Sequence, residues 1–155
     1  MKKFKTINEI KEANKDAGYF FFSPDTMRTF NSRVASGVLK GRYFVTREDN
    51  FDRSKFRYSV RMARDNGSIE RLGKFNGFNS LETAKTFIKT FPEHLPEAIE
   101  YALEVWNNGD LKDFLEKANL EPDNNQDKSF SMDTFCGACT WLLKNAEKLD
   151  FNILK

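Results

Sequence analysis

Residues 55–62 alternate strictly between two kinds of side chain, and this pattern constrains the fold more than any other feature of the chain. The apolar side chains are those of Phe56, Tyr58, Val60 and Met62. The intervening polar or cationic side chains are those of Lys55, Arg57, Ser59 and Arg61. A period of two residues is that of a strand with one face on the core. The segment is therefore predicted to be a strand whose second face is cationic and open to solvent.

Two neighbouring segments complete a predicted three-stranded antiparallel sheet. Residues 42–47, Arg-Tyr-Phe-Val-Thr-Arg, are rich in residues that favour strands. Asp65-Asn66-Gly67 is a hairpin signal, because Asn-Gly tolerates the positive φ angles of a tight turn. The turn leads into a third strand over residues 68–75.

Helical signals precede the sheet. Thr6 and Glu9 have the spacing of a capping box, which predicts a helix over about residues 7–17. The aromatic run 19–22, Tyr-Phe-Phe-Phe, suits a short buried strand. Ser23-Pro24 then predicts a short helix that extends to about Ser32.

Helical signals also follow the sheet. Asn79-Ser80 predicts a helix cap, and the helix is expected to stop at Pro92. Apolar stripes at helical spacing continue through the rest of the chain. The predicted fold class is α+β: a three-stranded antiparallel sheet packed by helices, followed by an all-helical C-terminal part.

Charge divides the chain into two parts. Residues 1–91 carry 10 Lys and 9 Arg against 10 acids, a net charge of +9, whereas residues 92–155 carry 6 Lys against 13 acids, a net charge of −7. We therefore predict a basic α+β domain over 1–91 and an acidic helical domain over 92–155. The basic part is suited to attract phosphates. The acidic part is either a solvated helical coat or a surface that contacts protein as a nucleic-acid mimic.

The cationic face of the sheet is the candidate nucleic-acid-binding site. All nine arginines lie between Arg28 and Arg71, and guanidinium forks match phosphates and guanine edges bidentately. Solubility alone would accept Lys equally well, so the use of Arg favours binding over an ordinary solvated face. The predicted contacts to DNA or RNA are Arg28, Arg33, Arg42, Arg47, Lys55, Arg57, Arg61, Arg71 and Lys74.

The sequence favours binding over catalysis. No phosphate-binding loop or zinc-protease motif occurs, so no cofactor or metal is predicted. Cys136 and Cys139 lack a second Cys pair and the only His, His94, is distant, which favours structural packing. Scattered carboxylates such as those of Asp25, Glu48 or Asp49 need no local motif, so a nuclease stays an alternative. The lack of an 18-residue apolar run predicts a cytoplasmic protein.

The sheet region resembles known DNA-binding domains. Residues 56–61, 65–68, 72–75 and 81–84 are similar to the sheet-then-helix pattern of AP2-type and integrase amino-terminal domains. In that group the sheet enters the major groove, which implies contacts from Arg57, Arg61 and Arg71. The order of elements is also similar to that of double-stranded-RNA-binding domains, although Lys85 alone represents their lysine cluster.

A closer resemblance covers about residues 6–91. Residues 10–14, 17–21, 25–33 and 41–46 resemble a small domain of unassigned chemistry that is found in phage and plasmid proteins. Some of these proteins are similar to type II anti-CRISPR inhibitors. The resemblance implies a counter-defence protein in a bacterial host, an inhibitor that binds nucleic acid or the ribonucleoprotein of an RNA-guided nuclease. A nuclease acting on guide RNA or DNA, and an inhibitor that contacts protein alone, stay as alternatives.

Overall fold

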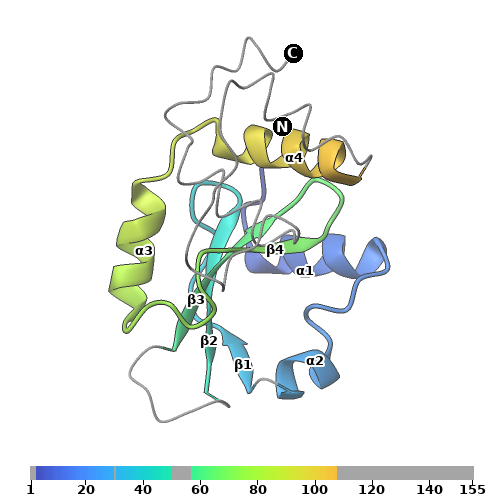
Figure 1. Ribbon diagram of the computed structural model, residues 1–155. Helices are drawn as coiled ribbons and strands as arrows, with labels where there is room; N and C mark the ends of the chain where they lie inside the picture. Colours follow the sequence, from blue (N-terminus) through green and yellow to red (C-terminus); the bar gives the residue numbers. More distant parts are fainter. Residues whose placement is uncertain (1–2, 30, 50–56, 108–155) are drawn as a thin grey trace. The chain divides into compact units, whose positions relative to one another are not determined.

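The computed structural model describes residues 3–29, 31–49 and 57–107 (Figure 1). The chain divides into two compact units, Met1–Thr90 and Phe91–Lys155, one residue before the boundary predicted from charge. The first unit contains helices and strands in the order α1 (Ile7–Asp16), α2 (Pro24–Thr29), β1 (Ser32–Val34), β2 (Tyr43–Glu48), β3 (Tyr58–Ala63), β4 (Ile69–Leu72) and α3 (Leu81–Lys89). The second unit contributes α4 (Leu95–Asn107). Most of the predicted C-terminal helical part, with Cys136 and Cys139, lies outside the described residues.

The first unit has an α+β fold, and its described strands form one four-stranded antiparallel sheet in the order β1-β2-β3-β4. The prediction of three strands was wrong because it missed β1. Residues 24–32 were predicted to form one helix, but α2 ends at Thr29 and Asn31 has a φ of 45°. That left-handed conformation is one that Asn tolerates better than most residues, and the chain enters β1 directly after it.

The prediction of a buried strand at residues 19–22 was also wrong. Helix α1 ends in a Schellman motif, in which Gly18 has a φ of 87° and its N–H bonds to the Lys15 carbonyl at 3.0 Å. The Tyr19 N–H bonds to the Asn14 carbonyl at 3.0 Å. These bonds turn the chain at the end of α1, and residues 19–22 form a connection with Tyr19 exposed.

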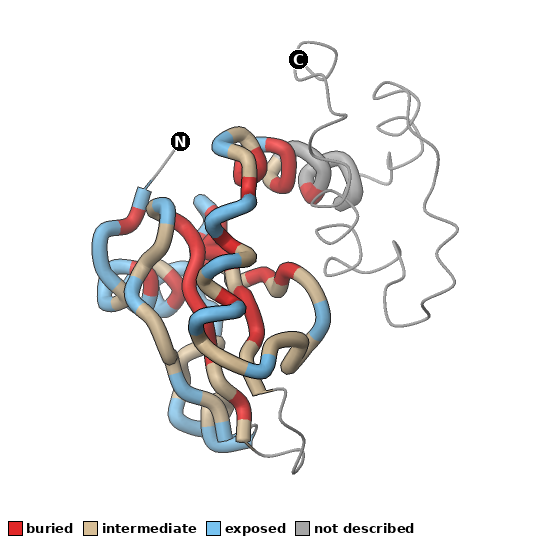
Figure 2. The backbone as a smooth tube through the Cα atoms, turned by 90° about the vertical axis from the view of Figure 1, so that its left-hand side faces the viewer, coloured by how far each residue is buried: buried red, intermediate tan, exposed pale blue. Residues whose placement is uncertain are grey.

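Both faces of the sheet are covered, so its strands are largely buried while exposed residues gather on helices and connections (Figure 2). Helix α3 packs against β2 and β3. It covers the face of the sheet that carries the side chains of Val45, Val60 and Met62. The opposite face contributes Phe44 and Ala63 to a second cluster, which contains Phe4 and Ile10 of α1 together with the partly buried Phe21 and Phe22. In the described residues no helix has the length and apolar character needed to cross a membrane.

The β3–β4 hairpin confirms the turn predicted at Asp65-Asn66-Gly67, but Asn66 and Gly67 do not both have positive φ angles. Arg64 and Ser68 close a three-residue loop, with the Arg64 N–H bonded to the Ser68 carbonyl at 2.9 Å. Gly67 has a φ of 89°, whereas Asn66 does not have a positive φ. This is the arrangement of a three-residue hairpin loop with glycine in the left-handed position. The buried Asn14 side chain donates to the Gly67 carbonyl at 2.8 Å, which ties the hairpin to α1.

We predict that Gly67→Ala lowers the free energy of unfolding by about 1–3 kcal/mol. A Cβ at this position would lie 2.5 Å from the Ala13 carbonyl oxygen, and the positive φ strains any L residue. The matched control is Gly37→Ala, because a Cβ there meets nothing within 4 Å. Urea denaturation followed by circular dichroism measures both variants. Equal stability of the two variants would show that the hairpin does not depend on this close approach.

Candidate nucleic-acid interface

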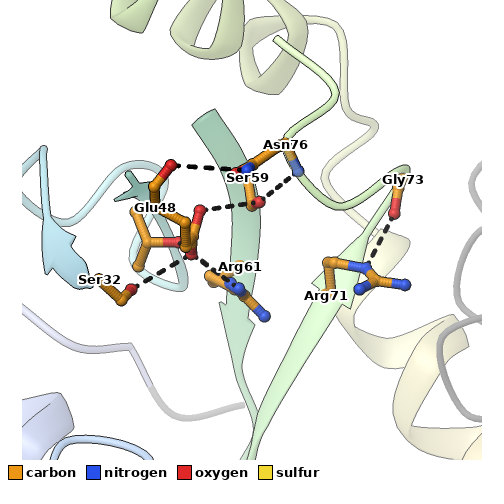
Figure 3. Close-up of polar contacts among 8 residues, drawn as sticks. Ser32, Glu48, Ser59, Arg61, Arg71, Gly73 and Asn76 are labelled. Atoms are coloured by element: carbon orange, nitrogen blue, oxygen red, sulfur yellow. Dashed lines mark hydrogen bonds and ion pairs between the residues drawn. The ribbon is translucent and has the colours of Figure 1, made fainter. Parts of the chain in front are cut away.

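The carboxylate of Glu48, at the end of β2, is buried at the centre of a polar network (Figure 3). Its Oε1 accepts hydrogen bonds from Thr46 Oγ1 at 2.6 Å, Arg61 Nη2 at 2.9 Å and Ser32 Oγ at 3.3 Å. Its Oε2 accepts from Ser59 Oγ at 3.1 Å. Donors from β1, β2 and β3 therefore converge on one anion, as a buried charge requires.

Asn76 closes the network from the segment that follows β4. Its backbone N–H donates to Ser59 Oγ at 2.8 Å, and its φ is 53°. We assign the side-chain amide with its nitrogen toward Glu48 Oε2, at 2.9 Å, and the Arg57 carbonyl, at 3.1 Å, because the reverse orientation would place oxygen against acceptors only. This geometry satisfies both oxygens of Glu48.

Arg61 is held inside the same network. Its Nε donates to Thr46 Oγ1 at 3.1 Å, and its Cζ lies 5.3 Å from the ring centroid of Phe21 and 5.8 Å from that of Phe75. The side chain is only 13% exposed, and its neighbour Ser59 is fully buried. The predicted cationic solvent face is therefore wrong at this position, because the chain after α1 covers it and Glu48 neutralises the charge.

Arg42 is also an internal residue. The side chain is 2% exposed, donates through Nη1 to the Ala63 carbonyl at 3.0 Å and forms an ion pair with Asp65. Its Cζ lies 6.0 Å from the ring centroid of Phe4. The strand begins at Tyr43, one residue later than predicted. Arg42 therefore joins the N-terminal segment to the hairpin. The prediction that its side chain lies on the surface was wrong.

Three other predicted arginines converge on Asp49, and we call Arg33, Arg47 and Arg57 around this residue the arginine cluster. Arg47 Nε lies 2.9 Å from Asp49 Oδ1, Arg57 Nη1 lies 3.7 Å from Oδ1, and Arg33 Nη2 lies 3.6 Å from Oδ2. Arg33 and Arg47 are direct partners across β1 and β2. The antiparallel register therefore assembles side chains that are far apart in the sequence.

The cluster has an excess of positive charge and is partly open to solvent. Arg33 is 62% exposed and Arg57 is 39% exposed, while Arg47 is more covered and lies over the Tyr58 ring. The hydrogen bond from Arg47 holds the pKa of Asp49 below its ordinary value, and the charges of Arg47, Arg33 and Arg57 act in the same direction. The same hydrogen bond raises the pKa of Arg47. Three guanidinium groups thus surround one carboxylate that stays ionised.

The remaining predicted contacts belong neither to the Glu48 network nor to the arginine cluster. Arg71 pairs with Arg61 across β3 and β4, donates through Nε to the Gly73 carbonyl at 3.2 Å and lies 5.7 Å from the Phe75 ring centroid. Arg28 is exposed on α2, with Nη1 4.0 Å from Asp25 Oδ1, and Lys74 is exposed after β4. Lys55 lies outside the described residues.

The candidate carboxylates of a nuclease do not assemble a metal site in the described part of the chain. No group of three or more His, Cys, Asp or Glu side chains there is placed to hold a metal ion. Glu48 instead pairs with Arg61 of the neighbouring strand β3, and Asp49 pairs with Arg47 of β2 and Arg33 of β1. The sequence analysis did not predict this role of Glu48. Glu48 lies on the same face of β2 as Thr46, and this alternation indicates a shared polar site once β3 is known to pair with β2.

Comparison with protein families gives a match, whereas comparison with individual proteins does not. No curated protein and no solved structure matches the chain. Residues 6–89, more than half of the chain, match the family described as "Family of unknown function (DUF7447)". The matched range runs from the cap of α1 to the end of α3 and contains the Glu48 network and the arginine cluster. The chain therefore belongs to this family of unknown function.

Proposed function

We propose that the first unit binds nucleic acid through the arginine cluster. The observation that supports this proposal is the convergence of three guanidinium groups on one carboxylate at a partly exposed end of the sheet. The cluster has two positive charges in excess, and guanidinium forks match phosphate oxygens bidentately. Asp49 holds the arginines close together, so a phosphate meets cations that are already gathered.

The surroundings of the cluster support the same role. Residues 1–91 carry a net charge of +9, which raises the local concentration of any polyanion. Arg28 and Lys74 are also exposed and Arg71 is partly exposed, so the first unit presents further cations to solvent. Arg42 and Arg61 have a different role. They hold the N-terminal segment and the sheet together and make no contact with the ligand.

The biological setting that we propose follows from the resemblance of residues 6–91 to domains of phage and plasmid proteins. The protein acts in the cytoplasm of a bacterial host as a counter-defence factor of a mobile element. Its target is the nucleic acid or the ribonucleoprotein of an RNA-guided nuclease, and the acidic residues 92–155 contact protein. The arginine-rich unit supports this setting because such a target presents a continuous phosphate backbone.

A gel-shift experiment with the full-length chain tests the binding proposal. Labelled RNA and DNA are incubated with the protein at low salt, once with Mg²⁺ and once with EDTA. We expect a complex that dissociates as salt is raised, with the strand recovered intact in both conditions. Failure to form a complex with any strand at low salt would overturn the proposal. Shortened strands that appear only with Mg²⁺ would instead identify a nuclease.

A further inference from the structure

The aromatic run 19–22 separates into rings that build the core and rings that face solvent. Phe21 and Phe22 pack on the cluster that contains Phe44. Phe20 is 73% exposed and Tyr19 is 42% exposed, and these two are the large hydrophobic side chains that stand open to solvent in the described part of the chain. Exposing a phenylalanine ring has an unfavourable hydration free energy. Two adjacent exposed rings within a basic unit therefore suggest a ligand that covers them.

The exposed rings stand on a backbone that is fixed on both sides. The Tyr19 N–H bonds to the Asn14 carbonyl at 3.0 Å, and the Ser23 N–H bonds to the Phe20 carbonyl at 3.1 Å. The neighbouring Phe21 ring lies edge-on to Phe22, with centroids 4.8 Å apart, and also edge-on to Phe44 at 6.3 Å. A ring presented from such a support loses little conformational entropy when a flat ligand stacks on it.

Contacts between aromatic rings and arginine side chains continue from this segment across the sheet. Arg61 stands between the Phe21 and Phe75 rings, and Arg71 lies over the same Phe75 ring. Figure 3 shows the Arg71 guanidinium directed away from the Glu48 network, with Nε bonded to Gly73. Arg71 is partly exposed and forms no ion pair with any residue that the structure describes.

We infer that the ligand is a single strand, whose unpaired bases stack on Phe20 and Tyr19 while its phosphates meet Arg71 and the arginine cluster. This inference rests on the proposed nucleic-acid binding. Aromatic rings combined with cationic side chains are the means by which proteins hold single strands, since every base has a flat face to stack. A duplex keeps those faces covered by neighbouring base pairs. The cationic groups therefore bind the phosphates of a single strand and of a duplex alike, whereas the two rings stack only on the bases of a single strand.

The test measures anisotropy of a labelled single strand and of the matching duplex with the wild-type chain and with Phe20→Ala. We expect Phe20→Ala to weaken single-strand binding about 5- to 150-fold and to leave duplex binding unchanged. The inference is overturned if Phe20→Ala weakens binding of the single strand and of the duplex equally, or if it does not weaken binding of the single strand. The proposed function survives that result as long as the wild-type chain binds one of the two ligands.

Two further variants keep the test specific. Phe20→Leu retains an apolar side chain without a ring and should bind the single strand as weakly as Phe20→Ala. Phe20→Trp retains a ring and should bind as well as the wild-type chain. Stacking on the new indole should also quench its fluorescence, measured as the difference from the wild-type chain, which has two Trp of its own. A Phe20→Trp variant that binds without extra quenching would contradict base stacking at this residue.

Discussion

Replacing Glu48 with alanine is expected to lower the free energy of unfolding by about 3–5 kcal/mol, more than Gly67→Ala does. The substitution leaves the Arg61 guanidinium, which is 13% exposed, without its anion. It also removes the acceptor of Thr46 and Ser59, whose hydroxyl groups are buried. A buried donor without a partner adds its own desolvation penalty. The measurement is equilibrium unfolding in urea followed by circular dichroism.

Two matched variants separate charge from shape at this position. Glu48→Gln keeps the size of the side chain but removes the charge. Its free energy of unfolding should therefore lie between that of the wild-type chain and that of Glu48→Ala. Ser32→Ala removes the longest bond to the carboxylate, at 3.3 Å, and should cost about 1 kcal/mol or less. If Glu48→Ala unfolds at the same urea concentration as Ser32→Ala, the network does not hold the sheet together.

The double variant Arg33→Ala with Arg57→Ala is expected to weaken nucleic-acid binding about 10- to 30-fold at low salt, since each exposed guanidinium–phosphate pair contributes on the order of 1 kcal/mol. Arg33 and Arg57 are the two more exposed members of the arginine cluster. Arg47 is left in place because it lies over Tyr58 and bonds to Asp49. Fluorescence anisotropy with a labelled oligonucleotide measures the dissociation constant.

The control for this variant removes the same charge elsewhere. Lys5→Ala with Lys89→Ala also lowers the net charge by two, and both lysines are exposed outside the cluster. We expect this control to bind within about 3-fold of the wild-type chain, because charges far from the ligand are screened. Equal weakening by the two double variants would mean that net charge, and not the arginine cluster, determines binding.

Local sequence patterns were sufficient to predict the helices and strands that have strict alternation, a turn motif or a capping residue. The alternation in residues 55–62 and the turn at Gly67 predict β3 and β4, and the capping residues Thr6 and Ser80 predict the starts of α1 and α3. In contrast, β1 has three residues, too few for a periodic signal. The run 19–22 has strand-like composition, but the end of α1 at Gly18 determines its conformation.

The candidate site depended on contacts that no local pattern contains. Alternation along β3 predicts which side chains share a face with Arg61, but not that the segment after α1 would cover that face. Arg33, Arg47 and Arg57 were each predicted as contacts, yet their convergence on Asp49 follows from the register of three strands. Register is a tertiary property that pairs residues distant in sequence, so the cluster emerges only in the folded chain.

The salt dependence of binding reports whether the arginine cluster contacts phosphates. Dissociation constants for one labelled strand are measured over a series of salt concentrations with the wild-type chain and with Arg33→Ala/Arg57→Ala. Each phosphate contact contributes about 0.7–0.9 to the slope of log K against log salt. We predict that the slope of the variant, which lacks two such contacts, is smaller in magnitude by about 1.4–1.8. A wild-type chain that fails to bind, or a variant with an unchanged slope, would contradict the assignment of the arginine cluster as the phosphate-binding surface.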